Sequence, residues 1–386
     1  MLLEHLGGHA NITNVDPGHG GYHHVNEQPE EYWIDKMAEY GFVFDRECRP
    51  NFGAVALCQT EKNLKDLLKK EDSSLLMNKS KPNVVAIKEL MWTYHPLDPS
   101  WKLVPFADKK TIESADVFVQ SNIKECKREK KIGSIYQYVI DSGKPWIVAE
   151  SAVFRNNMPQ PPNPKAYHRY SWFSYFRDEG EYNNKNCPPD RWLQIQKDQK
   201  IEIKDWKESG DYVLLILQRP GDSSLKNLIA RYGDYDNFLT SVIHDIRRHT
   251  DRKIRIRLHP LRQDRQLEIL NRLKLKNVEI SKNTHGAGLL SGGDGLYEDF
   301  KNAKVVVGFN SNALTESVCE GIPTFSLCPS SMAWDCSNTD LNDLENPKTF
   351  DRQQWLNNLG YCQWREDEIA IGKPWEHLKS LYPNLL

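Results

Sequence analysis

Short apolar runs alternate with longer amphipathic segments over most of the chain, and this alternation is what most limits its fold. In the first block, residues 84–87, 116–119 and 145–149 have the length and the β-branched or aromatic content of buried strands. Residues 124–141, between two of these runs, have the pattern of a helix. Strands that alternate with helices in this way predict a parallel sheet with crossover helices.

A second block of the same kind begins near residue 211. It contains predicted strands at 212–217, 253–258, 278–280, 305–307 and 324–326, and predicted helices at 235–249, 264–273, 296–302 and 311–319. Two such blocks predict an α/β protein with two Rossmann-like, doubly wound lobes that face a cleft. The carboxyl ends of the strands would face this cleft, where folds of this class bind their ligands.

The other segments are predicted from their composition. Residues 156–165 are rich in Pro and Asn, and an aromatic cluster follows at 167–176. Neither has the pattern of a sheet interior, so we predict a long loop or an interdomain passage. The Trp-rich tail, 352–386, is predicted to be helical. We expect three parts: an N-terminal segment (1–57), an acceptor-side lobe (58–205) and a donor-binding lobe with its tail (206–386).

The composition excludes several classes of protein. The chain has 386 residues, enough for about two domains, and its 39% hydrophobic and 27% charged residues are typical of a globular protein. No apolar run approaches the ~18 residues of a membrane span, and the first residues do not resemble a secretory signal. The eight cysteines form no Cys-x-x-Cys pair, which fits a reduced compartment. We therefore expect a cytoplasmic protein without a metal site.

The charge is close to balanced, with a formal net charge of -2 at pH 7. Proteins that bind nucleic acid over a large surface are usually basic, so the overall balance does not favour this function. Residues 219–280 nevertheless contain fourteen Arg or Lys against eight Asp or Glu. This local excess would attract an anionic donor, and it leaves a basic groove possible.

One predicted strand ends in the sequence Arg257-Leu258-His259-Pro260. Because Pro cannot continue an interior strand, the imidazole is expected at the carboxyl end of the sheet, where ligands bind. There His259 could donate to a phosphate oxygen or help a leaving group depart, with Arg257 adding positive charge. A His that only caps a turn is an equally good interpretation of this dipeptide.

A second candidate site follows the predicted strand at 305–307. The strand leads into Asn310, Ser311 and Asn312, where a helix is predicted to begin. Unpaired N–H groups at a helix start, together with the Ser311 hydroxyl, suit a phosphate. Glu316, on the first turns of this helix, could bind a ribose hydroxyl. The alternative is that Asn310 and Ser311 simply cap the helix.

A third candidate loop follows the predicted strand at 212–217. It contains Gln218, Arg219, Gly221 and Ser223. A Gly turn with hydroxyl groups suits phosphate or sugar oxygens, although no Gly-Lys-Ser/Thr of a Walker loop follows.

A pair of carboxylates precedes Gly180 in the aromatic-rich loop. Asp178 or Glu179 could act as a general base that removes a proton from an acceptor hydroxyl. Charged loop residues are most often just solvated, which is the alternative here.

Together these motifs resemble those of GT-B glycosyltransferases, in particular capsule-type and sialyltransferase-like enzymes. That family has an acidic-acidic-Gly motif, a His-Pro motif and a Ser-containing motif at a helix start, and residues 178–180, 259–260 and 310–312 follow the same order. The resemblance covers about residues 205–335 and departs from the family at Asn312, where a second Ser or Thr is usual. It implies Asp178 or Glu179 as catalytic base, His259 on the donor phosphate or leaving group, and Ser311 on the phosphate. Residues 331–335, 351–355 and 363–364 resemble phage-encoded and bacterial relatives.

The first 57 residues resemble a different family. Residues 23–34, followed by Gly41 and Phe42, are similar to the C-terminal end of a class I S-adenosylmethionine methyltransferase. That fold needs a Gly-rich cofactor loop upstream, so we expect a remnant and not a working methyltransferase. Five histidines fall within residues 5–24, but their irregular spacing fixes no metal geometry, and we expect a structural or solvated role.

The sequence thus predicts an enzyme that transfers a sugar from a nucleotide-activated donor to a hydroxyl acceptor. We expect an inverting, metal-independent reaction with a glycan acceptor, and no cofactor besides the nucleotide-sugar co-substrate. Two alternatives stay open. One is a phage enzyme that glycosylates hydroxymethylated pyrimidine bases of DNA in the host cytoplasm, and the other is a non-catalytic module that binds a nucleotide sugar.

Overall fold

The computed structural model describes residues 81–121, 130–155, 157–260, 263–273, 275–282 and 293–383, together with three short strands nearer the N-terminus. These strands are β1 (Ala10–Ile12), β2 (Phe42–Phe44) and β3 (Val55–Gln59), and they form an antiparallel sheet in the order β1-β3-β2. They belong to a compact unit, residues 1–80, that is distinct from residues 81–386. The five early histidines and most of the methyltransferase-like segment lie outside the described residues.

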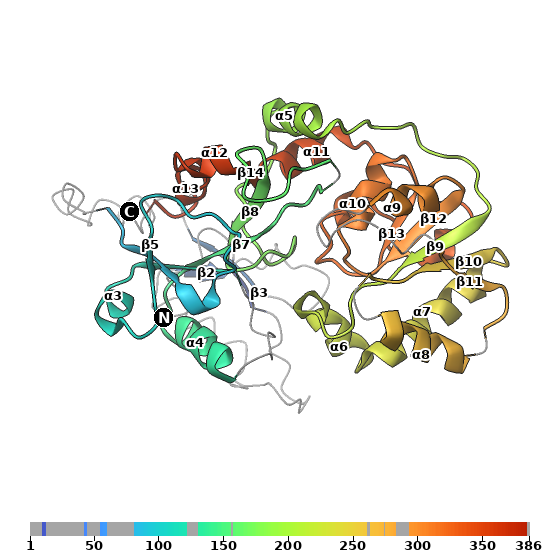
Figure 1. The fold of residues 1–386 in the computed structure, drawn as a ribbon, viewed down its shortest axis with the longest axis horizontal. Helices are drawn as coiled ribbons and strands as arrows, with labels where there is room; N and C mark the ends of the chain where they lie inside the picture. The colour runs from blue at the N-terminus through green and yellow to red at the C-terminus, as the bar shows by residue number, and fades with distance from the viewer. Residues whose placement is uncertain are drawn as a thin grey trace. The chain divides into compact units, whose positions relative to one another are not determined.

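Residues 81–386 contain two sheets (Figure 1). The first has six strands in the order β14-β8-β7-β6-β4-β5. Strands β5, β4, β6 and β7 are parallel, whereas β8 is antiparallel to β7, and β14 is antiparallel to β8. Helix α4 (Lys130–Asp141) is the crossover helix predicted at 124–141, whereas α3 (Lys109–Glu113), which precedes β6, was not predicted. The strands are β4 (Val84–Ile87), β5 (Lys102–Val104), β6 (Val117–Gln120), β7 (Trp146–Ser151), β8 (Tyr167–Trp172) and β14 (Gln363–Arg365).

The first sheet is covered on both faces, which explains the continuous apolar runs of its strands. Successive side chains of a strand point to opposite faces. On one face Val85 of β4 packs in a cluster with Ile135 and Val139 of α4. On the other face Val84 shares a cluster with Trp172 of β8. A strand buried on both sides needs apolar residues at every position.

The second sheet is entirely parallel, in the order β11-β10-β9-β12-β13. Its strands are β9 (Tyr212–Ile216), β10 (Lys253–Arg257), β11 (Val278–Ile280), β12 (Ala303–Gly308) and β13 (Thr324–Ser326). The helices between them are α6 (Lys226–Tyr232), α7 (Tyr235–His249), α8 (Gln263–Leu273), α9 (Gly293–Phe300) and α10 (Ala313–Cys319). This sheet is also covered on both faces: Val213 packs in a cluster with Val242 of α7, and Leu214 in another with Leu314 of α10.

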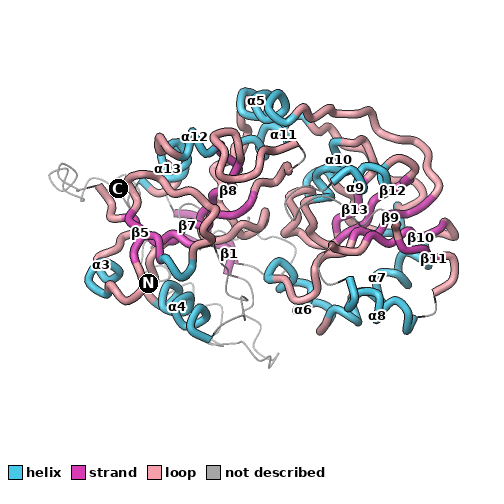
Figure 2. The backbone as a smooth tube through the Cα atoms, viewed as in Figure 1, coloured by secondary structure: helices cyan, strands magenta, loops and turns pink. Residues whose placement is uncertain are grey.

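Most predicted elements are confirmed. The described residues form strands at all eight predicted positions of the two blocks, and α7 has the predicted bounds. The predicted α/β class with two Rossmann-like lobes is the class observed. Figure 2 also shows the long connections, such as the loop between α5 (Asp190–Gln199) and β9.

The prediction of a loop at 167–176 was wrong, because its first six residues form β8 inside the first sheet. All six residues of β8 are buried. Aromatic and polar residues are mixed on both faces of this strand, so the sequence shows no simple alternation. Tyr170 and Trp172 fill the core, whereas His168 and Arg169 make hydrogen bonds.

The tail contains the predicted helices and one strand that was not predicted. The helices are α11 (Gln353–Gly360), α12 (Glu366–Ile369) and α13 (Lys373–Lys379). Strand β14 pairs with β8, so the tail completes the first sheet although it follows the second along the chain. Trp172 Nε1 also donates to Leu378 O, at 3.0 Å. The predicted domain limits stay a prediction.

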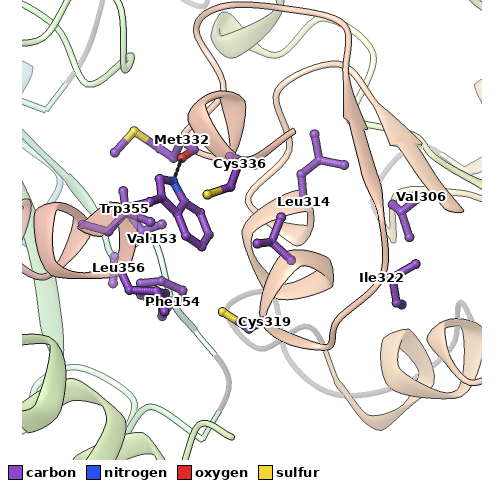
Figure 3. Packing of buried hydrophobic residues seen from close by; sticks show 14 of the residues in the cluster. Val153, Phe154, Val306, Leu314, Cys319, Ile322, Met332, Cys336, Trp355 and Leu356 are labelled. Carbon is purple, nitrogen blue, oxygen red and sulfur yellow. Dashed lines mark hydrogen bonds between the residues drawn. The ribbon is translucent and has the colours of Figure 1, made fainter. Parts of the chain in front are cut away.

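One hydrophobic core joins the segment after β7 to the second block. Val153 and Phe154 of that segment belong to the same cluster as Leu314 and Cys319 of α10 and Trp355 of α11 (Figure 3). The Trp355 indole donates to the carbonyl of Met332 at 2.9 Å. The carboxyl end of β7 therefore leads directly to α10.

Candidate functional site

The second sheet reverses its strand order between β9 and β12. From β9 the chain adds β10 and β11 on one side, and then β12 and β13 on the other. Sheets of this kind bind ligands beyond the carboxyl ends of the strands, at the point of reversal. Gln218 comes after β9 and Asn310 after β12, so these two predicted donor-binding residues flank the reversal.

Three of the predicted residues lie level with one another at this edge. The last residues of β10 and β12 both pair with Ile216, the last residue of β9. Gln218, His259 and Asn310 each follow two residues after the end of their strand. Because neighbouring strands are about 4.8 Å apart, the backbones of His259 and Asn310 are roughly 10 Å apart, with Gln218 between them.

Gln218 and Asn310 are fixed by hydrogen bonds to each other. Gln218 Nε2 donates to Asn310 Oδ1 at 2.7 Å, and Asn310 N donates to Gln218 Oε1 at 3.1 Å. Both side chains also contact Ser224, at 3.2 Å to its hydroxyl and 2.9 Å to its carbonyl. These bonds hold the loops after β9 and β12 together, and a donor-binding role for the two residues stays a prediction.

His259 is half-buried, and its backbone is held by Gln266 of α8. His259 N donates to Gln266 Oε1 at 2.9 Å. Gln266 Nε2 in turn donates to the Gln218 carbonyl at 2.8 Å and to the Tyr235 hydroxyl at 2.9 Å. The loop after β10 is thereby joined to the loop after β9. Gln266 was not predicted, because a Gln within an amphipathic helix carries no distinguishing signal.

Ser311 and Asn312 lie between β12 and α10 and are half-buried. The Ser311 hydroxyl accepts a hydrogen bond from Ala313 N at 3.3 Å. Asn312 Nδ2 donates to the carbonyl of Ala152 at 3.3 Å. The helix has seven residues and begins at Ala313, two residues later than predicted. Asn312 therefore connects the start of α10 to the segment after β7.

Glu316 is buried in α10, and burial raises the pKa of its carboxyl group to about 7. The neighbouring Glu320 also raises this pKa, whereas the Tyr297 hydroxyl and the charges of Arg155 and Arg257 act in the opposite direction. Tyr297 donates to Glu316 Oε2 at 3.3 Å. The predicted contact of Glu316 with a ribose hydroxyl stays a prediction.

A small cavity adjoins Glu316. Its volume is about 150 Å³, and its lining includes Phe154, Tyr297 of α9 and the two lysines Lys200 and Lys204. By this measure one water molecule needs about 10–15 Å³, so the cavity has room for several waters.

Arg257 is buried in an ion pair, although the sequence suggested it for the phosphate. Its Nη1 donates to Asp299 Oδ2 at 2.6 Å and to Gly295 O at 3.0 Å. The fully buried Asp299 also accepts from the Ser281 hydroxyl at 2.7 Å. This arrangement connects β10 to α9, and a phosphate contact by Arg257 stays a prediction.

The loop after β9 forms the predicted turn. Gly221 has a φ of 77°, the left-handed region that glycine adopts most easily, and a side chain there would meet nothing within 4 Å. Asp222 accepts from Ser224 N at 2.9 Å and so caps the short helix 223–225. Burial raises the pKa of Tyr175 well above its usual value, and the adjacent Ser223 hydroxyl acts against this. Arg219 lies half-buried in the same turn.

The acidic motif lies in a hairpin loop that contacts the second block. Trp172 and Glu181 close this loop with a pair of backbone hydrogen bonds of 3.0 and 3.2 Å. Asp178 is exposed. Glu179 accepts from Lys226 Nζ at 2.6 Å and from the Ser174 hydroxyl at 3.2 Å. Because Lys226 begins α6, the loop after β9 and the acidic motif are neighbours.

A polar group at the carboxyl edge of the first sheet was missed by the sequence analysis. Glu150 lies at the end of β7, and Arg155 five residues further. Burial raises the pKa of Tyr94, and Glu150 raises it further, whereas Ser151 and Arg155 lower it. Glu150 directly follows the strand predicted at 145–149, so the rule that found Gln218 would also have found Glu150 in the first block. Arg155 lies four residues beyond the end of β7 and carries no comparable signal.

Two buried histidines lie beside this group. His95 Nδ1 is 2.8 Å from the Ser121 hydroxyl, and His168 Nε2 is 3.0 Å from Glu366 Oε1. The two rings meet edge to face at 5.5 Å. Burial lowers the pKa of His95 to about 3, and the nearby His168 and Arg155 lower it further. His95 is therefore neutral at neutral pH.

In the part of the chain that the structure describes, no three His, Cys, Asp or Glu side chains are grouped so that they could hold a metal ion. Within the same residues, no helix is long and apolar enough to cross a membrane. Cys187, Cys319, Cys328, Cys336 and Cys362 are buried free thiols.

No protein-family model matches the chain, and no curated protein matches it either. Among solved structures, the chain is similar to two described as Thermosulfurimonas dismutans KpsC. The first, a beta Kdo 2,4 transferase, has a TM-score of 0.48 at 12% identity and covers 74% of this chain and 93% of its own. The second, a beta Kdo 2,7 transferase, has a TM-score of 0.43 at 12% identity, with coverages of 72% and 90%. A wall teichoic acid polymerase TagF variant has a TM-score of 0.22 at 13% identity, with coverages of 84% and 93%. Likenesses of this strength assign neither substrate nor activity.

Proposed function

We propose that the protein is a glycosyltransferase that moves a sugar from a nucleotide-activated donor to a hydroxyl group of a glycan. The main support for this proposal is that three predicted residues lie together at the carboxyl ends of three neighbouring strands. Gln218, His259 and Asn310 come from parts of the chain far apart in sequence, and they are level with one another where the sheet order reverses. Such an edge is the usual place for a nucleotide in a doubly wound sheet.

The proposed donor site uses neutral and basic side chains on the phosphates. The Ser311 hydroxyl and the His259 imidazole are the hydrogen-bond donors that the sequence placed there. Hydrogen-bond donors aimed at a phosphate leaving group stabilise the charge that develops when the bond to the sugar breaks. In this scheme no metal is required for donor binding.

The proposed chemistry is an inverting displacement. The acceptor oxygen forms a bond to the anomeric carbon as the bond from that carbon to the phosphate oxygen breaks, and the nucleotide leaves with that electron pair. The acceptor proton passes to a carboxylate acting as a general base. Asp178 is the better candidate of the acidic pair, because Glu179 already accepts hydrogen bonds from Lys226 and Ser174.

The alternative of a DNA acceptor gains little support. Several arginines of the basic block are paired with carboxylates: Arg255 with Glu279 at 2.6 Å, Arg257 with Asp299 at 2.6 Å, and Arg265 with Asp236 at 2.9 Å. Charges that are already paired contribute less to the release of counterions that drives DNA binding.

The experiment is a donor assay with a panel of nucleotide sugars, in which donor hydrolysis and transfer are followed by mass spectrometry. We expect H259A to lower kcat by about 10²- to 10⁴-fold, the usual contribution of a group that assists proton transfer or leaving-group departure. H244A, which removes an exposed histidine of α7, should leave kcat unchanged.

Two outcomes would contradict the proposal. Nucleotide binding without turnover on any donor, and without an effect of H259A, would indicate the non-catalytic binding module. Absence of both nucleotide binding and turnover would exclude a nucleotide-sugar site altogether.

A further inference from the structure

The hairpin loop that follows β8 contacts the second block through polar groups at two places. The Lys226 ammonium donates to Glu179 Oε2 at 2.6 Å. Arg177 forms an ion pair with Asp335, in which Nε donates to Oδ2 at 3.0 Å, and its backbone N donates to the Ser330 carbonyl at 3.2 Å. Lys226 begins α6, after β9, whereas Ser330 and Asp335 follow β13. The hairpin loop therefore bridges two segments that leave the carboxyl edge of the second sheet.

The same loop is attached to the first sheet by apolar contacts. Tyr175 and Phe176 are buried and pack in one cluster with Val148 of β7. At the start of the loop, Phe173 N donates to the Trp146 carbonyl at 2.9 Å, and the Trp146 indole donates to the Phe173 carbonyl at 2.9 Å. The loop is thus a fixed part of the first block, and its contacts with the second block are polar.

Both ion pairs are partly exposed to solvent. The side chains of Lys226 and Glu179 are 26% and 36% exposed. Those of Arg177 and Asp335 are 31% and 52% exposed. A partly exposed ion pair changes an equilibrium by a factor of only about two to five, and salt weakens it. By contrast, the hydrophobic core around Trp355 joins the two blocks through buried apolar side chains. One apolar connection and one weak polar connection are the parts of a hinge that can open and close.

The hairpin loop also engages a residue that was predicted to bind the donor. The Tyr175 hydroxyl interacts with the Ser223 hydroxyl in the turn after β9. Strand β12, which leads to Ser311, lies between β9 and β13 in the sheet. The loop therefore contacts segments on both sides of the one that carries Ser311. A nucleotide that uses the Ser223 hydroxyl must displace Tyr175.

We infer that the hairpin loop is a latch between the two blocks, and that it opens to admit the nucleotide donor. Two ion pairs close it: Lys226 with Glu179, and Arg177 with Asp335. While they are formed, the loop engages Ser223; when they separate, the turn after β9 is released. The identity of the ligand rests on the proposed function, whereas the opening of the loop does not depend on it.

The first experiment measures opening without a ligand, by hydrogen exchange and mass spectrometry of the full-length chain. The amide of Arg177 reports the latch, because its N–H is bonded to the Ser330 carbonyl while the latch is closed. We expect K226Q to speed its exchange about two- to fivefold, the factor of one such ion pair. Raising NaCl to about 0.5 M should speed it in the wild type. E298Q breaks an exposed ion pair with Lys301 in α9 and should leave it unchanged.

The second experiment measures nucleotide binding by calorimetry, with cytidine monophosphate and uridine diphosphate as probes. R177Q and D335N break the same ion pair but change the net charge in opposite directions. Both should bind a probe about two- to fivefold more tightly than the wild type, because more of the protein is open. A direct effect of charge would instead weaken binding in R177Q and tighten it in D335N. A saturating probe should also speed exchange of the Arg177 amide, since a ligand that binds the open form increases its population.

The inference fails on any of three results: unchanged exchange in K226Q and at high salt, opposite effects of R177Q and D335N on nucleotide affinity, or slower exchange of the Arg177 amide with a probe bound. R177K keeps the charge and should return exchange and affinity toward the wild type. If R177Q does not fold, as judged by circular dichroism, D335N against E298Q decides the matter. Faster exchange in K226Q with no nucleotide binding by any variant would contradict the proposed function and leave the opening of the loop standing.

Discussion

Glu316 brings a carboxyl group into the packed region between α10 and the segment after β7. It is 6% exposed, and its pKa is raised to about 7, mainly by burial. In the unfolded chain the same group ionises near 4.5. The folded protein therefore holds a proton between these two values that the unfolded chain has lost. By linkage, the free energy of unfolding decreases as the pH rises from about 4.5 to 7.

We predict that E316Q removes this pH dependence. One pKa unit corresponds to about 1.4 kcal/mol, so the variant should gain up to about 3 kcal/mol of unfolding free energy relative to wild type between pH 5 and pH 8. Urea unfolding at the two pH values measures the difference. E298Q, on the exposed face of α9, should stay within about 0.5 kcal/mol of wild type at both. Parallel pH profiles of E316Q and wild type would show that Glu316 is ionised in the fold at both values.

Single residues of the candidate site were predictable to the extent that they follow a buried strand. This rule found Gln218, His259 and Asn310, which share one edge. It could not show that Arg257 is held in an ion pair, because its partner Asp299 is 42 residues away and belongs to another element. Contacts of this kind depend on how elements pack and leave no local pattern in the sequence.

Among the elements, β8 shows where sequence patterns fail. A strand buried on both faces has no alternation of polar and apolar residues, and β8 in addition carries His168, Arg169 and Ser171. Their burial is compatible with the fold because other segments supply partners, such as Glu366 for His168 and the Tyr175 carbonyl for Arg169. By contrast, the Val- and Ile-rich strands of both sheets were predictable from composition alone.

The hairpin loop that follows β8 depends on Gly180. A Cβ atom at this position would lie 2.1 Å from the Ser174 carbonyl oxygen and 2.8 Å from that of Phe176. We predict that G180A destabilises the protein by about 1–3 kcal/mol, the usual cost of forcing extra atoms into a packed region. Chemical denaturation measures this cost.

G133A is the matched control for that substitution. Gly133 lies within α4, and a Cβ there meets nothing within 4 Å. Alanine is the better helix former, so G133A should stabilise the protein by about 0.5–1 kcal/mol. The same sign for both variants would show that the hairpin loop has room that the structure does not indicate.

Within residues 81–386 as a whole, the position of the tail was predicted least accurately. A Trp-rich, helical segment was expected, and no local signal showed that its short strand β14 would pair with β8. The α12 carboxylate of Glu368 connects the tail to Arg191 of α5. Burial alone would raise its pKa, but hydrogen bonds from Arg191, at 2.9 and 3.0 Å, prevail and lower the pKa to about 2.

We predict that the first sheet loses much of its stability when the tail packs poorly. Trp375 of α13 is 9% exposed and contacts Trp101 and Trp172, with ring centroids 6.3 and 6.1 Å away. W375A should lower the free energy of unfolding by about 3–5 kcal/mol, as other deletions of large buried side chains do. I371A, at a 70% exposed position of the same tail, should change it by less than about 0.5 kcal/mol. Equal unfolding midpoints for W375A and I371A would contradict this role of the tail.

The pairing of β14 with β8 has a consequence for synthesis on the ribosome. The two strands are neighbours in one sheet, yet about 190 residues are translated between them, including the whole second sheet. Domains usually fold in the order in which they emerge. All strands of the second sheet are therefore synthesised before β14, and until then β8 has an unpaired edge. The first sheet begins to form first but is completed last.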